Sequence, residues 1–109
     1  MSIFGRFYQN YRRDAIKFVT AAATLTPVDR VVEATATAAW AITLPPVSEC
    51  AGQVYTIHAE ISSSGAVTVQ DQNDSIDWTD RLLDADLDGV CLFSDGRKWW
   101  VICNDVSLS

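Results

Sequence analysis

The C-terminal segment Val90–Cys103 most constrains what this chain can fold into. Two apolar runs flank the pair Asp95-Gly96. An Asp-Gly pair in this position is a strong indication of a tight β-hairpin, because a two-residue type I′ turn needs positive φ at both central residues. We therefore predict a hairpin with a two-residue turn at Asp95-Gly96. The register that follows pairs Phe93 with Lys98, Leu92 with Trp99, Cys91 with Trp100, and Val90 with Val101.

Both faces of this predicted hairpin are apolar. One face would carry Val90, Leu92, Trp99, Val101 and Cys103, and the other Cys91, Phe93, Trp100 and Ile102. A small antiparallel sheet buries only one face against its own core. The second face must then meet another layer or another subunit. We therefore predict a subunit interface at Phe93, Trp100 and Ile102, which favours an assembly component over a free-standing enzyme.

The length of 109 residues fits one domain. No apolar run approaches the roughly 20 residues that span a bilayer. The start, Met1–Arg6, lacks the apolar stretch and small-residue cleavage site of a signal peptide, so we expect a protein that is made and used without secretion.

The three cysteines, Cys50, Cys91 and Cys103, do not have metal-ligand spacing. We expect them to be buried free thiols. The predicted hairpin register disfavours a Cys91–Cys103 disulfide, because it places these two residues on opposite faces.

Charge is unevenly distributed along the chain. Residues 1–15 contain Arg6, Arg12, Arg13 and Asp14, a net charge of +2, whereas residues 16–109 contain five basic and thirteen acidic residues, a net charge of −8. An acidic body argues against nucleic acid or an anionic membrane as the main partner. A short basic, aromatic arm could instead dock onto an acidic protein surface.

We divide the chain into an N-terminal docking arm, residues 1–15, and a β domain, residues 16–109. A helical spacing of apolar residues runs through the arm, but Gly5 weakens a helix, and an extended arm that orders on a partner fits equally well. Either form exposes aromatic surface that is costly to leave in water, so the arm should be covered. The predicted docking residues are Phe4, Arg6, Phe7, Tyr8, Tyr11, Arg12 and Arg13.

The β domain shows short β-type runs separated by turn signals. Pro45-Pro46 ends one run, and Ser62–Gly65 is predicted to be a hairpin loop between two strands. This pattern predicts an all-β fold, a small antiparallel β-sandwich or a barrel-like domain. The predicted strands are Ile16–Thr20, Val31–Thr35, Trp40–Leu44, Gln53–Ile61 and Ala66–Gln70, followed by an acidic, turn-rich segment from Asp71 to Asp88 and the final hairpin.

The sequence contains no recognisable catalytic constellation. His58 is the single histidine and lies within a predicted strand, and no nucleophile–base pair or phosphate-binding glycine loop accompanies it. We therefore predict no enzymatic activity and no cofactor.

The segment Asp84–Asp95 matches the spacing of a calcium loop. Acidic residues stand at its positions 1, 3, 5 and 12, and Gly89 at position 6. The match conflicts with the strand predicted over Val90–Phe93, so an acidic solvated loop is the favoured interpretation. The weak calcium candidates are Asp84, Asp86, Asp88 and Asp95.

The four tryptophans have two candidate uses. Aromatic residues dominate cores and interfaces, which is the favoured role of Trp99 and Trp100 because their strand is apolar on both faces. Trp40 and Trp78 are less constrained, and either could stack on a sugar.

The order of several short segments is similar to small β domains of tailed-bacteriophage virion proteins. The segments are Leu25–Val32, Ile42–Pro46, Ala51–Ile57, Ser64–Val69 and Leu92–Trp99. The resemblance covers roughly residues 17–103 and implies a structural or attachment role, because such domains occur in tail fibres, tailspikes and head decoration proteins, often as trimers. It implies no catalytic residue.

The chain is too short to contain a fibre shaft, so a capsid decoration or cement protein of the virion fits better than a tail fibre. We expect a homotrimer, assembled in the host cytoplasm, that binds the major capsid protein or a neighbouring virion protein. The alternative is a tail-fibre or tail-associated module that binds a receptor or glycan.

Overall fold

A computed structural model describes residues 16–104, and these form nine β-strands and one short 3-10 helix. The all-β prediction is confirmed for this part of the chain, and each predicted strand is present with its ends shifted by at most two residues. The elements are β1 Ile16–Val19, β2 Ala23–Thr24, β3 Val31–Ala36, β4 Ala39–Thr43, η1 Val47–Glu49, β5 Val54–Ile61, β6 Ala66–Gln70, β7 Arg81–Leu83, β8 Gly89–Ser94 and β9 Trp99–Asn104.

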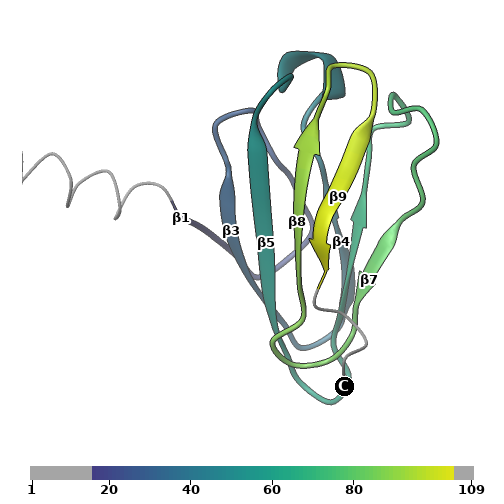
Figure 1. Cartoon of the computed structure of the whole chain (residues 1–109). Coiled ribbons are helices and arrows are strands. Elements are labelled where there is room, and N and C mark those ends of the chain that lie inside the picture. Colours follow the sequence, from purple (N-terminus) through teal and green to yellow (C-terminus); the bar gives the residue numbers. More distant parts are fainter. Residues whose placement is uncertain (1–15, 105–109) are drawn as a thin grey trace, which may run out of the picture.

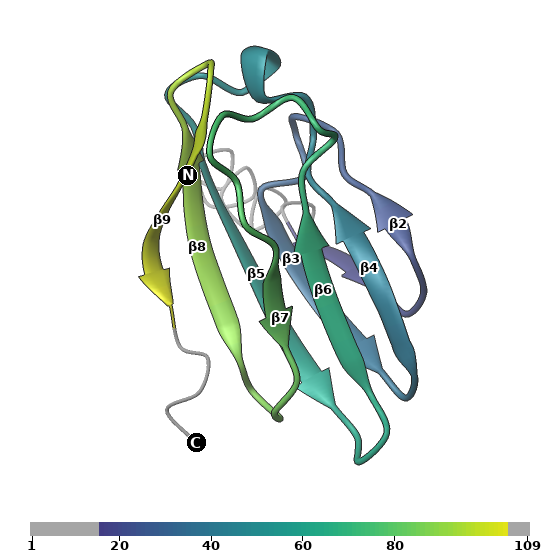
Figure 2. The ribbon, with the colours of Figure 1, turned by 90° about the vertical axis from the view of Figure 1, so that its right-hand side faces the viewer.

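The strands form two mixed sheets (Figures 1 and 2). Sheet A has the order β1-β3-β5-β8-β9, and sheet B has the order β2-β4-β6-β7. Up to β6, successive strands alternate between the two sheets, so that neighbours within each sheet run parallel. Antiparallel pairing begins only with β7, β8 and β9. The antiparallel prediction is therefore right only for this last part, and the sheets do not close into a barrel.

The predicted hairpin across Ser62–Gly65 is wrong, because this loop carries the chain from sheet A to sheet B. The Ser62 N–H donates to the Ala36 carbonyl at 3.0 Å, and β6 then runs parallel to β4. Gly65 lies against the same carbonyl, and a Cβ at this position would overlap the Ala36 oxygen. Parallel neighbours need a crossover connection. Here each crossover contains a strand of the opposite sheet.

Side chains from the inner faces of both sheets form one core. The alternation of buried and more exposed positions along β5 and β6 explains why these segments form strands, since period-two residues share a sheet face. Trp99 packs edge-on against Tyr55, with ring centroids 5.4 Å apart. The large buried side chains include Ile42, Tyr55, Ile57, Val67, Val69, Leu83 and Leu92.

Ser94 links the C-terminal hairpin to η1 in the interior. Its buried hydroxyl donates to the Val47 carbonyl at 2.6 Å and accepts the Gly96 N–H at 2.9 Å. Replacing Ser94 with alanine leaves both partners without this oxygen, and we expect a loss of about 1–3 kcal/mol of unfolding free energy in urea titrations. The exposed Ser64→Ala is the matched control, with an expected change below about 0.5 kcal/mol. Equal losses in the two variants would contradict a structural role for the Ser94 hydroxyl.

Candidate functional site

The turn of the C-terminal hairpin is wider than predicted. Ser94 pairs with Trp99 and Phe93 with Trp100, so the predicted register is wrong and the turn comprises Asp95 to Lys98. Of the pair Asp95-Gly96, only Gly96 has a positive φ, 95°. The reason lies in the Asp95 carboxylate, whose Oδ1 accepts the backbone N–H groups of Arg97 and Lys98, each at 2.8 Å. Such side-chain bonds stabilise an alternative to the two-residue turn.

The register error is an even number of residues, so it leaves most side chains on their predicted faces. Side chains alternate with period two along a strand. Leu92 is fully buried and Trp99 is 2% exposed, whereas Trp100 is 43% exposed and Phe93 half-buried. The predicted division of these four residues between the two faces is confirmed.

Cys103 is the exception, and its position corrects the cysteine prediction. The ladder is irregular between Cys91 and Leu92, so that Cys91 faces Cys103 and Ile102 is the extra residue of a bulge. The bulge turns Cys103 onto the face of Cys91, and the two form a disulfide. The expectations of free thiols here and of a disfavoured disulfide are therefore wrong. Cys50 is a buried free thiol as expected, and burial raises its pKa.

An apolar row crosses the outer face of sheet A, which is the face directed away from the core. Val54 of β5, Phe93 of β8 and Trp100 of β9 are neighbours in register, and we call these three residues the aromatic row. The Phe93 and Trp100 rings are stacked, 9° from parallel with centroids 6.2 Å apart. Val54 is 49% exposed, and Ile102 near the end of the row is 53% exposed. The Phe93 and Trp100 rings are therefore already packed against each other, and nearly half of the surface of Val54 and of Trp100 is exposed to solvent.

Further apolar side chains extend the outer face toward β1. Ile16 and Val31 are neighbours in register with Thr56, and Val31 and Thr56 each precede a residue that is buried in the core. Phe18, two residues along β1, is 73% exposed. Sequence reasoning missed these residues as part of the surface because it did not foresee that β1, β3 and β5 are parallel neighbours. The alternation within each strand was the available signal.

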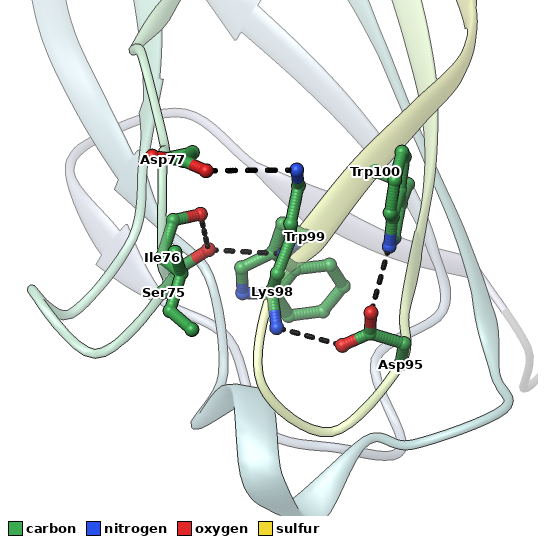
Figure 3. A network of polar contacts seen from close by, with 7 residues as sticks. All are labelled: Ser75, Ile76, Asp77, Asp95, Lys98, Trp99 and Trp100. Carbon is green, nitrogen blue, oxygen red and sulfur yellow. Dashed lines mark hydrogen bonds and ion pairs between the residues drawn. The ribbon is translucent and has the colours of Figure 1, made fainter.

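Polar groups at the hairpin end hold Trp100 in place (Figure 3). The Trp100 indole N–H donates to Asp95 Oδ2 at 2.9 Å. The Lys98 ammonium lies 4.1 Å from the centroid of the Trp100 ring and 3.8 Å from a carboxylate oxygen of Asp77. The Trp100 indole, followed by the Arg97 backbone N–H, lowers the pKa of Asp95. The ionised form of the Asp95 carboxylate therefore stabilises the turn from Asp95 to Lys98.

The Asp95 shift predicts a pH dependence of stability. Because the pKa of Asp95 is lower in the folded than in the unfolded protein, its stabilising effect is present above the unfolded pKa and is lost as the pH falls through the folded one. We expect Asp95→Asn to lower the urea midpoint at neutral pH, and the difference from wild type to shrink as the pH falls below 4. Asp84→Asn, at an exposed loop position, is the control for loss of a charge. A constant difference between wild type and Asp95→Asn from neutral to acid pH would contradict this account.

The structure separates the four calcium candidates. β8 lies between Asp88 and Asp95, which therefore stand at opposite ends of a strand. Asp86 accepts the Ile61 N–H at 2.9 Å, and the buried Asp88 accepts the N–H groups of Asp84 and Ala85. The Asp86 and Asp88 carboxylates therefore accept backbone N–H groups of β5 and of their own loop and do not form a cation-binding ring. Among residues 16–104, no cluster of three metal-ligating side chains is present.

The two tryptophans considered for sugar stacking are half-buried. Trp40 and Trp78 both pack against the core, and the Trp78 indole N–H donates to Asp80 at 2.9 Å. Trp100 is the most exposed of the four tryptophans. The seven predicted docking-arm residues lie outside the described residues, so their role stays a prediction. No helix in residues 16–104 is long and apolar enough to cross a membrane.

Comparison with known proteins found no match to a protein-family model, a curated protein or a solved structure.

Proposed function

We propose that this chain is a structural protein of a tailed-bacteriophage virion, in which a small β-sandwich decorates and stabilises the assembled capsid. Its partners are the major capsid protein or a neighbouring virion protein, and it acts as a homotrimer without enzymatic activity. The proposal is supported by the order of short segments that is similar to virion β domains and by the surface of sheet A.

The outer face of sheet A is the observation that carries this proposal. The core between the sheets is complete without it, because Tyr55, Ile57 and Leu92 are fully buried on the inner side. The opposite side of the same strands nevertheless exposes Val54 and Trp100. Contiguous exposed apolar surface of this kind marks protein–protein contacts. In the proposed trimer, Phe93, Trp100 and Ile102 supply the subunit interface.

Stabilisation of the capsid follows from mass action. A protein that binds the assembled shell but not its separated subunits lowers the free energy of the shell by RT ln(1 + [L]/Kd), about 2.7 kcal/mol at one hundred times Kd. Residues 1–15 supply the first contact, since their net charge of +2 complements an acidic protein surface. No chemical step is required.

Binding to purified empty capsids tests the proposal. We expect the full chain to sediment with capsids at hundreds of copies per particle, and the charge-reversed arm variant Arg6→Glu/Arg12→Glu/Arg13→Glu to lose binding. The body variant Lys17→Glu/Arg30→Glu/Arg81→Glu, which carries the same change of charge outside the arm, is the matched control and should still bind. A wild-type chain that does not bind capsids, or only a handful of copies per virion, would contradict a decoration role.

The second candidate, a tail-associated module that binds receptors or glycans, is favoured by one observation. Trp100 presents a half-exposed ring with the Asp95 carboxylate hydrogen-bonded at its edge, and ligand sites combine aromatic surfaces with a few polar groups. For this candidate we therefore propose Trp100 as the sugar-stacking residue, in place of Trp40 and Trp78, which were considered from the sequence. A glycan array separates the two functions, because a decoration protein gives no hits on it.

A further inference from the structure

We infer that residues 1–15 bind the aromatic row, so that the N-terminal arm covers Val54, Phe93 and Trp100 on the outer face of sheet A. The two surfaces that the sequence predicts separately, the docking arm and the hairpin interface, are then the two halves of one contact. On Val54, Phe93 and Trp100, the arm of the same or of a neighbouring copy then takes the place of the direct contact between hairpins given above for the trimer. This contact does not depend on the virion role, because it concerns only which part of the chain covers the row.

The position of β1 places the end of the arm at the level of the row. Ile16, the first residue of β1, is in register with Val31, Thr56 and Cys91 across the sheet. The aromatic row lies two residues before Thr56 on β5, and therefore at the end of sheet A where the chain enters β1. The arm thus joins the β domain beside the row and not at the opposite end of the sheet.

The arm is long enough to cross the whole row. β1 and β9 are the two edges of a five-stranded sheet, and four strand spacings of about 4.8 Å separate them by about 19 Å. Fifteen residues span about 50 Å when extended and about 22 Å as a helix. Either conformation lets the arm reach from β1 to Trp100.

The chemistry of the arm matches that of the row. The row offers two stacked rings, an aliphatic side chain and a carboxylate at its end, Asp95, which is exposed. The arm contains four aromatic side chains and three arginines within residues 4–13. Aromatic pairs attract beyond their buried area, and guanidinium groups both stack on rings and pair with carboxylates. The opposite net charges of residues 1–15 and of the rest of the chain, +2 and −8, favour the same contact.

A spin label in the arm tests the contact on the full chain. Gln9→Cys introduces the reactive thiol, because Cys50 is buried and Cys91 and Cys103 form a disulfide. We expect the label to attenuate the NMR signals of the Trp100 indole N–H and the Val54 and Phe93 amides. The signal of Trp40, on sheet B, should keep its intensity. Reduction of the nitroxide should restore the attenuated signals.

A pair of lysine variants supplies the control. Val54→Lys places a charge in the row, and Leu82→Lys places the same charge at a site of equal exposure on β7; both residues are 49% exposed. We expect Val54→Lys to abolish the attenuation at Trp100 and Leu82→Lys to leave it unchanged. Because both sites are exposed, both variants should keep the dispersed spectrum of the folded domain.

Mixing the label and the isotope between molecules identifies which copy supplies the arm. Attenuation only within one molecule assigns the arm to its own domain, and attenuation between a spin-labelled chain and a separate isotope-labelled chain assigns it to a neighbouring copy; both results place residues 1–15 on the row. An unattenuated Trp100 signal in both samples, or attenuation that survives Val54→Lys, would overturn the inference. Binding to capsids, tested independently, could still succeed.

Discussion

Replacing Trp99 with alanine is expected to destabilise the protein by about 3–5 kcal/mol, a large part of the stability of a small domain. Trp99 is 2% exposed and packs edge-on against Tyr55 in the core. The adjacent Trp100→Ala is the matched control. It removes a stacked ring and a cation–π contact at the surface, and we expect a loss of about 1–2 kcal/mol.

Urea unfolding of both variants, followed by circular dichroism, measures the difference. The comparison is sharp because the same side chain is removed from neighbouring positions of one strand. Equal losses at Trp99 and Trp100 would contradict the division of β9 into an inner and an outer face, and with it the exposed aromatic row.

Replacing Gly65 with alanine is expected to cost about 3 kcal/mol or more, since the added Cβ would overlap the carbonyl of Ala36 and force the two backbones apart. Gly52→Ala is the control. Gly52 has a φ of 80° but nothing within 4 Å of a Cβ, so we expect only the conformational cost of about 1–2 kcal/mol.

Thermal unfolding of the two glycine variants, read as the shift of the midpoint, provides the measurement. A Gly65→Ala protein as stable as Gly52→Ala would show that the Ser62–Gly65 crossing is not tightly packed against β3. The close contact of this loop with Ala36 would then not contribute to holding the chain where it passes from sheet A to sheet B.

Seven of the nine strands could be predicted from sequence because their signals are local, whereas the short strands β2 and β7 were missed. Pro45-Pro46 stops β4 since proline lacks the N–H that a ladder needs, and the alternation along Val54–Ile61 marks β5. The division of the hairpin into a core face and an outer face was also predictable. It depends only on side-chain alternation, which a register error of two residues leaves intact.

The pairing of the strands could not be predicted because it depends on contacts distant in sequence. Ser62–Gly65 has the composition of a hairpin loop, and only the close approach to Ala36 reveals a crossing between sheets. The turn register depends on the Asp95 carboxylate accepting two N–H groups, and an Asp-Gly pair fits either turn. No residue pattern in this segment indicates a bulge, so the pairing of Cys91 with Cys103 could not be predicted from the sequence.

The alternation of strands between the sheets has a consequence for the order in which the molecule can form. β8, which follows β7 in the sequence, lies between β5 and the edge strand β9 in sheet A. A nascent polypeptide emerging from the ribosome therefore cannot complete this layer until β8 and β9 have been synthesised. Pairings between remote segments also carry a large loop-closure cost, which slows folding. We expect the completion of sheet A to be governed by the docking of the β8–β9 hairpin.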